Sequence, residues 1–187
     1  MKELVISEQT RAWGEVLDEL REDNAKKQKS GLPFIIASIF IWSGIIVVCC
    51  MDLEPVMRNF LVFCMSTPLM PISYLAGRIL KVDIFDKSNP IGNLGFIFTL
   101  NQMLYLLIVM WAFRAVPDKM VMIYAMVFGA HLFPYFWLYK NKYYLVSAIF
   151  IPVISLVLGC LFSATVVAGV LAFYELVFAI CLAKSGK

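Results

Sequence analysis

Six long apolar segments limit what this chain of 187 residues can fold into. A helix needs about 20 apolar residues to cross the hydrocarbon core of a bilayer. The segments that reach this length are 32–51, 60–79, 94–113, 120–139, 143–162 and 163–183. Hydrophobic residues make up 61% of the chain, which is more than a water-soluble domain of this size carries. The sequence therefore predicts an all-α bundle of six transmembrane helices in a cell membrane.

The last two segments leave a second topology open. No charged residue lies between Lys142 and Glu175, so two full spans require a tight hairpin near residues 159–163. Four spans followed by a distorted re-entrant pair would agree with the same composition. Both arrangements keep the chain helical, because an irregular backbone facing lipid would leave its polar groups without partners.

Lysine and arginine are distributed unevenly over the loops and termini. The cytoplasmic side of a membrane protein carries an excess of these residues. With the N-terminus inside, thirteen of the 16 basic residues lie on the inner side, and the three outside are Arg58, Arg114 and Lys119. The sequence therefore predicts that both termini are cytoplasmic. The net charge of +3 follows from this bias and does not indicate a nucleic-acid partner.

Residues 1–31 are hydrophilic and predict a cytoplasmic amphipathic helix, which precedes a six-span transmembrane domain of residues 32–187. Its apolar residues recur at helical spacing and form one narrow stripe: Trp13, Val16, Leu17 and Leu20. The middle of this helix is acidic and would be repelled by anionic lipid. We therefore expect it to pack against the cytoplasmic loops or against a second copy of the chain.

Glu175 is the only acidic residue inside an apolar segment. A carboxyl group at that depth is costly and by default marks a functional site. At 1.5 Å per helical residue, Glu175 lies about 13–14 Å from Lys184 at the end of its helix. His131, the only histidine, lies at the same distance from Lys140, also nine residues away. We therefore expect Glu175 and His131 to lie at the same level in the membrane.

Further polar residues fall near this level and complete a predicted ligand or proton site: Asn101, Gln102, Tyr135, Ser66 and Thr67. Pro68 and Pro71 predict a break in the second span beside them, and Gly129 with Pro134 predicts a kink beside His131. In one interpretation, Glu175 and His131 share a proton while Asn101 or Gln102 orients a ligand. In the other, a neutral Glu175 is hydrogen-bonded to a tyrosine, asparagine or glutamine side chain and fixes helix register.

The Glu175 helix carries small residues on one face at three- and four-residue steps: Ala164, Ala168, Ala172, Ala179 and Ala183. Small residues let a neighbouring helix approach closely. We therefore expect this face to lie inside the bundle. The bulky residues Val167, Leu171 and Phe178 are expected to face lipid or to make looser contacts.

The sequence predicts no metal and no cofactor. The five cysteines lie in or at the ends of apolar segments without CxxC spacing, and we expect them to be buried thiols: Cys49, Cys50, Cys64, Cys160 and Cys181. One histidine and one buried acid are too few ligands for a catalytic metal site. The chain has no Walker loop, dinucleotide fingerprint, HExxH or GxSxG motif. These absences favour a role other than that of an enzyme.

Residues 26–35 (KKQKSGLPFI) and 37–42 (ASIFIW) resemble an uncharacterised bacterial family of short multi-pass integral membrane proteins. The resemblance covers mainly the first span and the overall size of the chain. It implies a bacterial inner-membrane location and supplies no activity.

Three functions remain open from the sequence. The first is a small proton- or ion-coupled transporter or channel, which contacts the lipid bilayer, forms homo-oligomers and acts on a solute or ion that the sequence does not identify. The second is a non-catalytic assembly or regulatory subunit of the membrane. The third is a lipid-active enzyme at the cytoplasmic face, which would use the polar loop residues Arg78, Lys81, Asp83 and Asp86.

Overall fold

The computed structural model describes the backbone of residues 2–185 and the side chains of residues 10–185. In this part of the chain the regular structure is helical and contains no strand. The α-helices are α1 (Lys2–Lys27), α2 (Leu32–Cys50), α3 (Pro55–Ser66), α4 (Leu69–Leu80), α5 (Gly92–Ala115), α6 (Met120–Ala130), α7 (Phe133–Tyr139), α8 (Lys142–Leu161) and α9 (Ala164–Ser185). Two short 3-10 turns, η1 (Lys29–Gly31) and η2 (Pro117–Lys119), lie before α2 and α6.

Six segments of the described chain are long and apolar enough to cross a membrane. Helices α3 and α4 together form the second span, and η2, α6 and α7 together form the fourth. The expected all-α bundle of six spans is therefore confirmed. Helices α8 and α9 are two separate helices joined at Phe162 and Ser163, so the re-entrant pair is not formed.

Helix α2 lies at the centre of the packing. It contacts α9 along its length and also contacts α3 and α4. Its residues carry no charge, and Trp42 and Ile45 are almost completely buried. The indole ring of Trp42 packs against the rings of Tyr124 and Phe128 in α6, with centroids 5.4 and 5.7 Å apart. Aromatic contacts of this kind thus join α2 to the fourth span.

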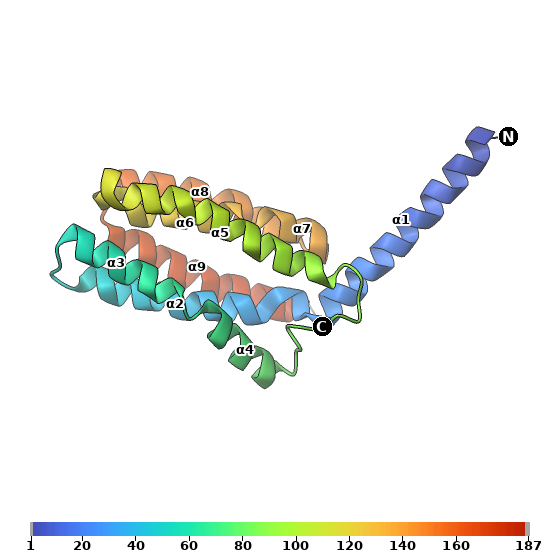
Figure 1. The fold of residues 1–187 in the computed structure, drawn as a ribbon, viewed down its shortest axis with the longest axis horizontal. Helices are drawn as coiled ribbons and strands as arrows, with labels where there is room; N and C mark the ends of the chain where they lie inside the picture. Colours follow the sequence, from blue (N-terminus) through green and yellow to red (C-terminus); the bar gives the residue numbers. More distant parts are fainter. Residues whose placement is uncertain (1, 186–187) are drawn as a thin grey trace.

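Both predicted interruptions of the spans are present. Pro68 and Pro71 have no backbone N–H, so α3 ends at Ser66 and α4 begins at Leu69. Figure 1 shows α4 bent away from the axis of α3, and α4 packs mainly on α2. Pro134 likewise cannot donate to the carbonyl of Ala130, where α6 ends. Two spans are thus broken near their middle.

The face that α9 buries is wider than the alanine face expected from the sequence. Ala168 and Ala179 are buried as expected, whereas Ala183 is exposed. The prediction that Val167, Leu171 and Phe178 face lipid was wrong, because all three are buried. Helices α2, α6 and α8 all contact α9, so more of its circumference is covered than one neighbouring helix would cover.

Helix α1 projects beyond the bundle, and the end of α9 lies beside its junction with α2 (Figure 1). The second half of α1 contacts α7 and the residue that follows α7. The Arg21 guanidinium donates to the Trp137 carbonyl at 2.7 Å from Nε, and Lys140 Nζ lies 2.9 Å from Glu22 Oε1. The side chains of Trp13, Val16 and Leu17 are exposed, and a partner for this stripe remains a prediction.

Gly129 marks a close approach of α6 to α8. A Cβ atom built there would lie 2.5 Å from Pro152 Cδ and 2.7 Å from Ile151 Cβ. We predict that Gly129→Ala lowers the free energy of unfolding by about 1–3 kcal/mol through overpacking. Gly169→Ala is the matched control, because no atom lies within 4 Å of its added Cβ, and it should not destabilise the protein. Denaturant unfolding in micelles measures both, and equal losses would contradict this helix crossing.

The ion pair of Lys140 with Glu22 predicts a pH dependence for the docking of α1. The hydrogen bond and charge of Lys140 hold the pKa of Glu22 below its usual value. The stabilisation is therefore present above the usual glutamate pKa of about 4.3 and is lost as the pH falls below it. The protection of residues 18–27 from hydrogen exchange, corrected for the intrinsic exchange rate at each pH, should fall on acidification and, at neutral pH, in Lys140→Gln. Lys142→Gln is the control, and an equal loss of protection in that variant would contradict the prediction.

Candidate functional site

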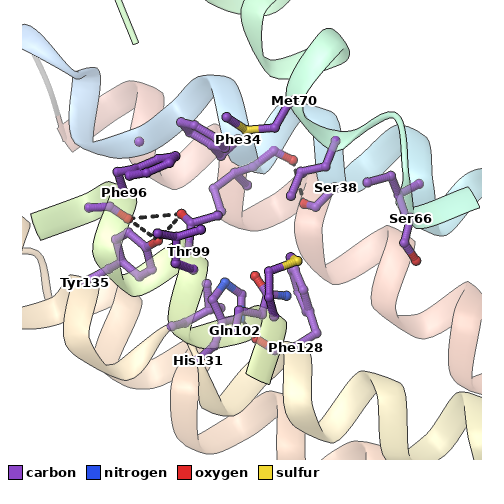
Figure 2. Close-up of a pocket in the computed structure, with 18 of the residues that line it drawn as sticks. Phe34, Ser38, Ser66, Met70, Phe96, Thr99, Gln102, Phe128, His131 and Tyr135 are labelled. Atoms are coloured by element: carbon purple, nitrogen blue, oxygen red, sulfur yellow. Dashed lines mark hydrogen bonds between the residues drawn. The ribbon is translucent and has the colours of Figure 1, made fainter. Parts of the chain in front are cut away.

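The two broken spans border an internal cavity of about 410 Å³, shown in Figure 2. This volume is within the range of small-molecule sites, which are mostly apolar with a few polar groups. Ten aromatic rings contribute to its lining: Phe34, Trp42, Phe63, Phe85, Phe96, Tyr124, Phe128, Tyr135, Tyr139 and Tyr144. Among the described residues that line it, there is no aspartate, glutamate, lysine or arginine. The cavity is thus an aromatic chamber without a fixed charge.

The cavity extends from the α1 end of the bundle to about its middle. Gln28 and Gly31 line it near α1, and its lining along α3 and α5 stops at Phe63 and Leu106. The opposite end of the bundle is closed by contacts to η2. Asn59 Nδ2 donates to the Pro117 carbonyl at 2.9 Å and Lys119 Nζ to the Gly159 carbonyl at 2.6 Å, while Arg58 and Asp118 lie 3.4 Å apart. The chamber therefore ends blindly on that side.

The cavity has exposed lining residues between α4 and α5. Helix α4 packs on α2 and leaves part of α5 uncovered. Phe96, Leu100 and Met103 of α5 line the cavity and are also 45–50% exposed. The chamber can thus be reached from the lipid-facing side of the bundle.

Five of the residues predicted for the site line this one cavity: His131, Gln102, Tyr135, Ser66 and Thr67. Gln102 is 6% exposed, and no hydrogen bond to its amide is found within the described residues. His131 Nδ1 contacts the Phe128 carbonyl, and a carbonyl only accepts, so Nδ1 carries the hydrogen. The second ring nitrogen, Nε2, then has a free lone pair. Gln102 and His131, with the hydroxyl of Tyr139, are therefore the polar groups available to a ligand.

Most hydroxyl groups around the cavity are already hydrogen-bonded; for that of Tyr139 no hydrogen bond is found within the described residues. Tyr135 donates to the Gly95 carbonyl at 3.0 Å and lies 2.8 Å from Thr99 Oγ1, as Figure 2 shows. Ser66 Oγ lies 2.8 Å from the Tyr124 hydroxyl, and Thr67 Oγ1 donates to the Cys64 carbonyl at 2.8 Å. These bonds position the walls rather than offer free ligand groups.

Two predicted site residues lie outside the cavity. Asn101 donates through Nδ2 to the hydroxyl of Tyr105, which is 40% exposed, and so belongs to the outer side of α5. Glu175 is completely buried between α9 and α2 and does not line the cavity. No hydrogen bond or ion pair joins Glu175 to His131 in the described part of the chain. The two residues are therefore not a bonded pair.

Ser38 connects Glu175 to the cavity. Its side chain lines the cavity, and its Oγ lies 2.5 Å from Glu175 Oε2. Ser38 Oγ also lies 2.8 Å from the carbonyl oxygen of Ile35, one turn earlier in α2. One hydroxyl thus separates the buried carboxyl group from the chamber.

The two contacts of Ser38 determine where the hydrogens lie. A hydroxyl has one hydrogen, and the Ile35 carbonyl can only accept it. Both bonds form together only when Glu175 supplies the second hydrogen and donates to Ser38. Glu175 Oε1 has no partner within the described residues, which is less costly for a neutral carboxyl group than for a carboxylate. The geometry therefore indicates a protonated Glu175.

Sequence reasoning missed Ser38, although a signal was present. Ser38 lies seven residues after Gly31, or about 10 Å along α2 at 1.5 Å per residue. Helix α9 runs the other way, and Glu175 lies ten residues, or about 15 Å, before its end. Counting depth on the first span would have placed the two residues within about one helical turn of each other.

The described residues contain no group of three or more side chains able to hold a metal ion. All five cysteines are free thiols. The prediction that they are buried was wrong for Cys50 and Cys160, which are exposed on the outside of the bundle.

Comparison with known proteins gives a family but no activity. No curated protein and no solved structure matches the chain. A model of a family of unknown function, DUF7010, matches residues 17–185, which include the second half of α1 and every span. The chain therefore belongs to the DUF7010 family of unknown function.

Proposed function

We propose that this membrane protein is a small proton-coupled transporter, with the aromatic cavity as its solute site and Glu175 as its proton-carrying group. The observation that supports the proposal is the position of Ser38, which lines the cavity and contacts the buried carboxyl group. Proton coupling requires at least a protonatable group close to a solute site. Here one hydroxyl group separates such a group from a chamber of small-molecule size.

The shape of the cavity favours a transporter over a channel. A channel needs a continuous path, whereas this chamber stops at Phe63 and Leu106. Transporters place their sites near the bilayer midplane beside interrupted helices. Here the α3–α4 and α6–α7 breaks both border the cavity. These breaks are the positions at which half-helices could move while the remaining spans stay packed.

Coupling follows from the cost of ionising Glu175. Loss of its proton would leave a carboxylate in a dry contact between α2 and α9, with Ser38 as its one hydrogen-bond partner in the described chain. That state becomes favourable only when another group compensates its charge. A solute that does so binds better when Glu175 is ionised, and by linkage it promotes release of the proton.

The orientation is part of the proposal. We place the protein in a bacterial inner membrane with the α1 end of the bundle on the cytoplasmic side, because thirteen of the 16 basic residues then lie inside. The chamber in this state is then open toward the cytoplasmic half, and the contacts of η2 close the outer half.

An assembly subunit is the second candidate, and one observation favours it. Trp13 is 72% exposed and lies with Val16 and Leu17 on an arm outside the bundle, which fits a binding surface for a second copy or another protein. A defined oligomer or complex in mild detergent would favour this role. The lipid-active enzyme has less support, because Asp83 and Asp86 accept hydrogen bonds from the backbone of their own loop.

Replacing Glu175 with glutamine tests the transport proposal. We expect Glu175→Gln to fold normally, because an amide can still donate to Ser38, but to lower solute-driven proton flux at least tenfold. Liposomes containing a pH-sensitive dye would be challenged with compounds of similar size and different charge: tetraphenylphosphonium, tetraphenylborate and triphenylphosphine oxide. Thr165→Val is the control, because it removes another α9–α2 hydrogen bond, to the Cys49 carbonyl, away from the cavity. Normal flux in Glu175→Gln would refute the proposal.

Ser38 gives a second, independent prediction. Ser38→Ala should destabilise the protein by about 1–3 kcal/mol, because it leaves the buried Glu175 without its partner. It should also lower proton flux, because it removes the link to the cavity. Ser43→Ala is the matched control on the same helix, since Ser43 bonds only to its own helix at the Ile39 carbonyl. If both variants behaved alike, Ser38 would have no special role.

A further inference from the structure

The rings of the cavity lining form a connected cluster that presents π faces and edges to the chamber. Tyr135 stacks with Tyr139 and Tyr144 at centroid distances of 5.9 and 5.7 Å. The His131 ring packs edge-on against Tyr135 at 5.9 Å and against Phe128 at 5.3 Å. Aromatic faces attract cations through their quadrupole, most strongly where water is excluded. The lining thus has an electrostatic preference even though it has no fixed charge.

The free polar groups have the same preference. With its hydrogen on Nδ1, His131 offers a lone pair at Nε2, and Gln102 offers its amide oxygen. For an anion, the amide of Gln102 offers free N–H donors, but the described lining residues include no lysine or arginine. Arg78 and Lys81 line a separate groove beside α4. The chamber is therefore better suited to positive charge than to negative charge.

We infer that the solute of this site is a lipophilic organic cation, exchanged for the proton of Glu175. This inference rests on the proposed transport function. In the exchange, the Glu175 O–H bond breaks and one proton leaves, while one monovalent cation enters. The carboxylate compensates the charge of the cation, so the net charge of the site does not change and no other reactant is needed.

An organic cation fits this site better than a metal ion. Ca²⁺ and Mg²⁺ require six or more oxygen ligands in a close shell. The free polar groups of the described lining are Gln102, His131 and the Tyr139 hydroxyl, which are too few for such a shell, and the other polar side chains are hydrogen-bonded to the protein. An apolar body would cover the aromatic walls and could enter from the bilayer between α4 and α5.

The surroundings of Glu175 contain no competing charge. Helix α2 has no charged side chain. The titratable groups that interact electrostatically with Glu175 are Tyr144 of α8 and Tyr174 of α9, and both phenols are neutral at pH 7. Helix α6 and its end contribute Tyr124 and His131, and neither is bonded to Glu175. The proton exchanged with a cation is therefore that of Glu175.

Two ions of the same shape and opposite charge test the inference by calorimetry on the full chain in micelles. We expect tetraphenylphosphonium to bind at least tenfold more tightly than tetraphenylborate, after subtraction of binding to protein-free micelles. About one proton should be released per cation, and the Kd should fall about tenfold per pH unit while Glu175 is protonated. Glu175→Gln should lose both the proton release and the pH dependence.

A matched pair of variants on α4 locates the binding. Met70 lines the cavity, and Met70→Trp should fill it and weaken tetraphenylphosphonium binding at least tenfold. Leu75 is 62% exposed and does not line the cavity, so Leu75→Trp should bind normally. Equal losses in the two variants would overturn the assignment to this cavity.

The remaining outcomes separate the solute class from the transport function. Tighter binding of tetraphenylborate, equal binding of both ions, or binding of neither would overturn the cation assignment. Cation binding with unchanged proton release in Glu175→Gln would overturn the exchange. If another compound drives a Glu175-dependent proton flux in liposomes, the transport function stands and the solute class fails. If no compound does so, the transport function fails.

Discussion

Proline residues in two spans determine what the bundle can enclose. A transmembrane helix satisfies its backbone internally, and a proline removes one of the required N–H groups. Pro68 and Pro71 separate α3 from α4, and Pro134 separates α6 from α7. Pro152, by contrast, lies within α8, which continues unbroken. The cavity borders the two breaks, so the same backbone constraint produces both the irregular helices and the chamber between them.

The fold could be predicted from the length and composition of the apolar segments. In lipid the backbone N–H and C=O groups must bond to one another, and for segments of this kind a helix is nearly the only structure that allows it. Depth along each helix also followed from the fixed rise per residue, and five candidates line one cavity. The direction in which each side chain points around its helix could not be predicted from the sequence. Asn101 and Gln102 are neighbours in sequence, yet Gln102 points into the chamber and Asn101 away from it. Nothing in a single uniformly apolar sequence indicates which side of α5 is inside.

The same limitation explains why the side chain bonded to Glu175 is not the one expected from the sequence. Matching depth made His131 its neighbour, but the side chain on the adjoining helix α2 is Ser38. Which helices touch depends on the packing of all the helices in the described chain, and α9 lies in extensive contact with α2 along its length. A serine in an apolar helix also gives a weak signal, because it usually bonds its own backbone, as Ser38 does to Ile35. Its second contact is visible only in three dimensions.

The single hydroxyl between Glu175 and the chamber has a kinetic consequence. In the proposed transport, a proton would cross this wall when the Ser38 O–H group rotates and exchanges hydrogens with its neighbours, and the rotation of one hydroxyl is fast compared with the motion of helices. Movement of half-helices about the breaks belongs to the microsecond-to-millisecond range. Protonation of Glu175 would therefore stay at equilibrium with the chamber during each conformational step. The turnover rate would be set by the contacts that hold η2 closed and not by the passage of the proton.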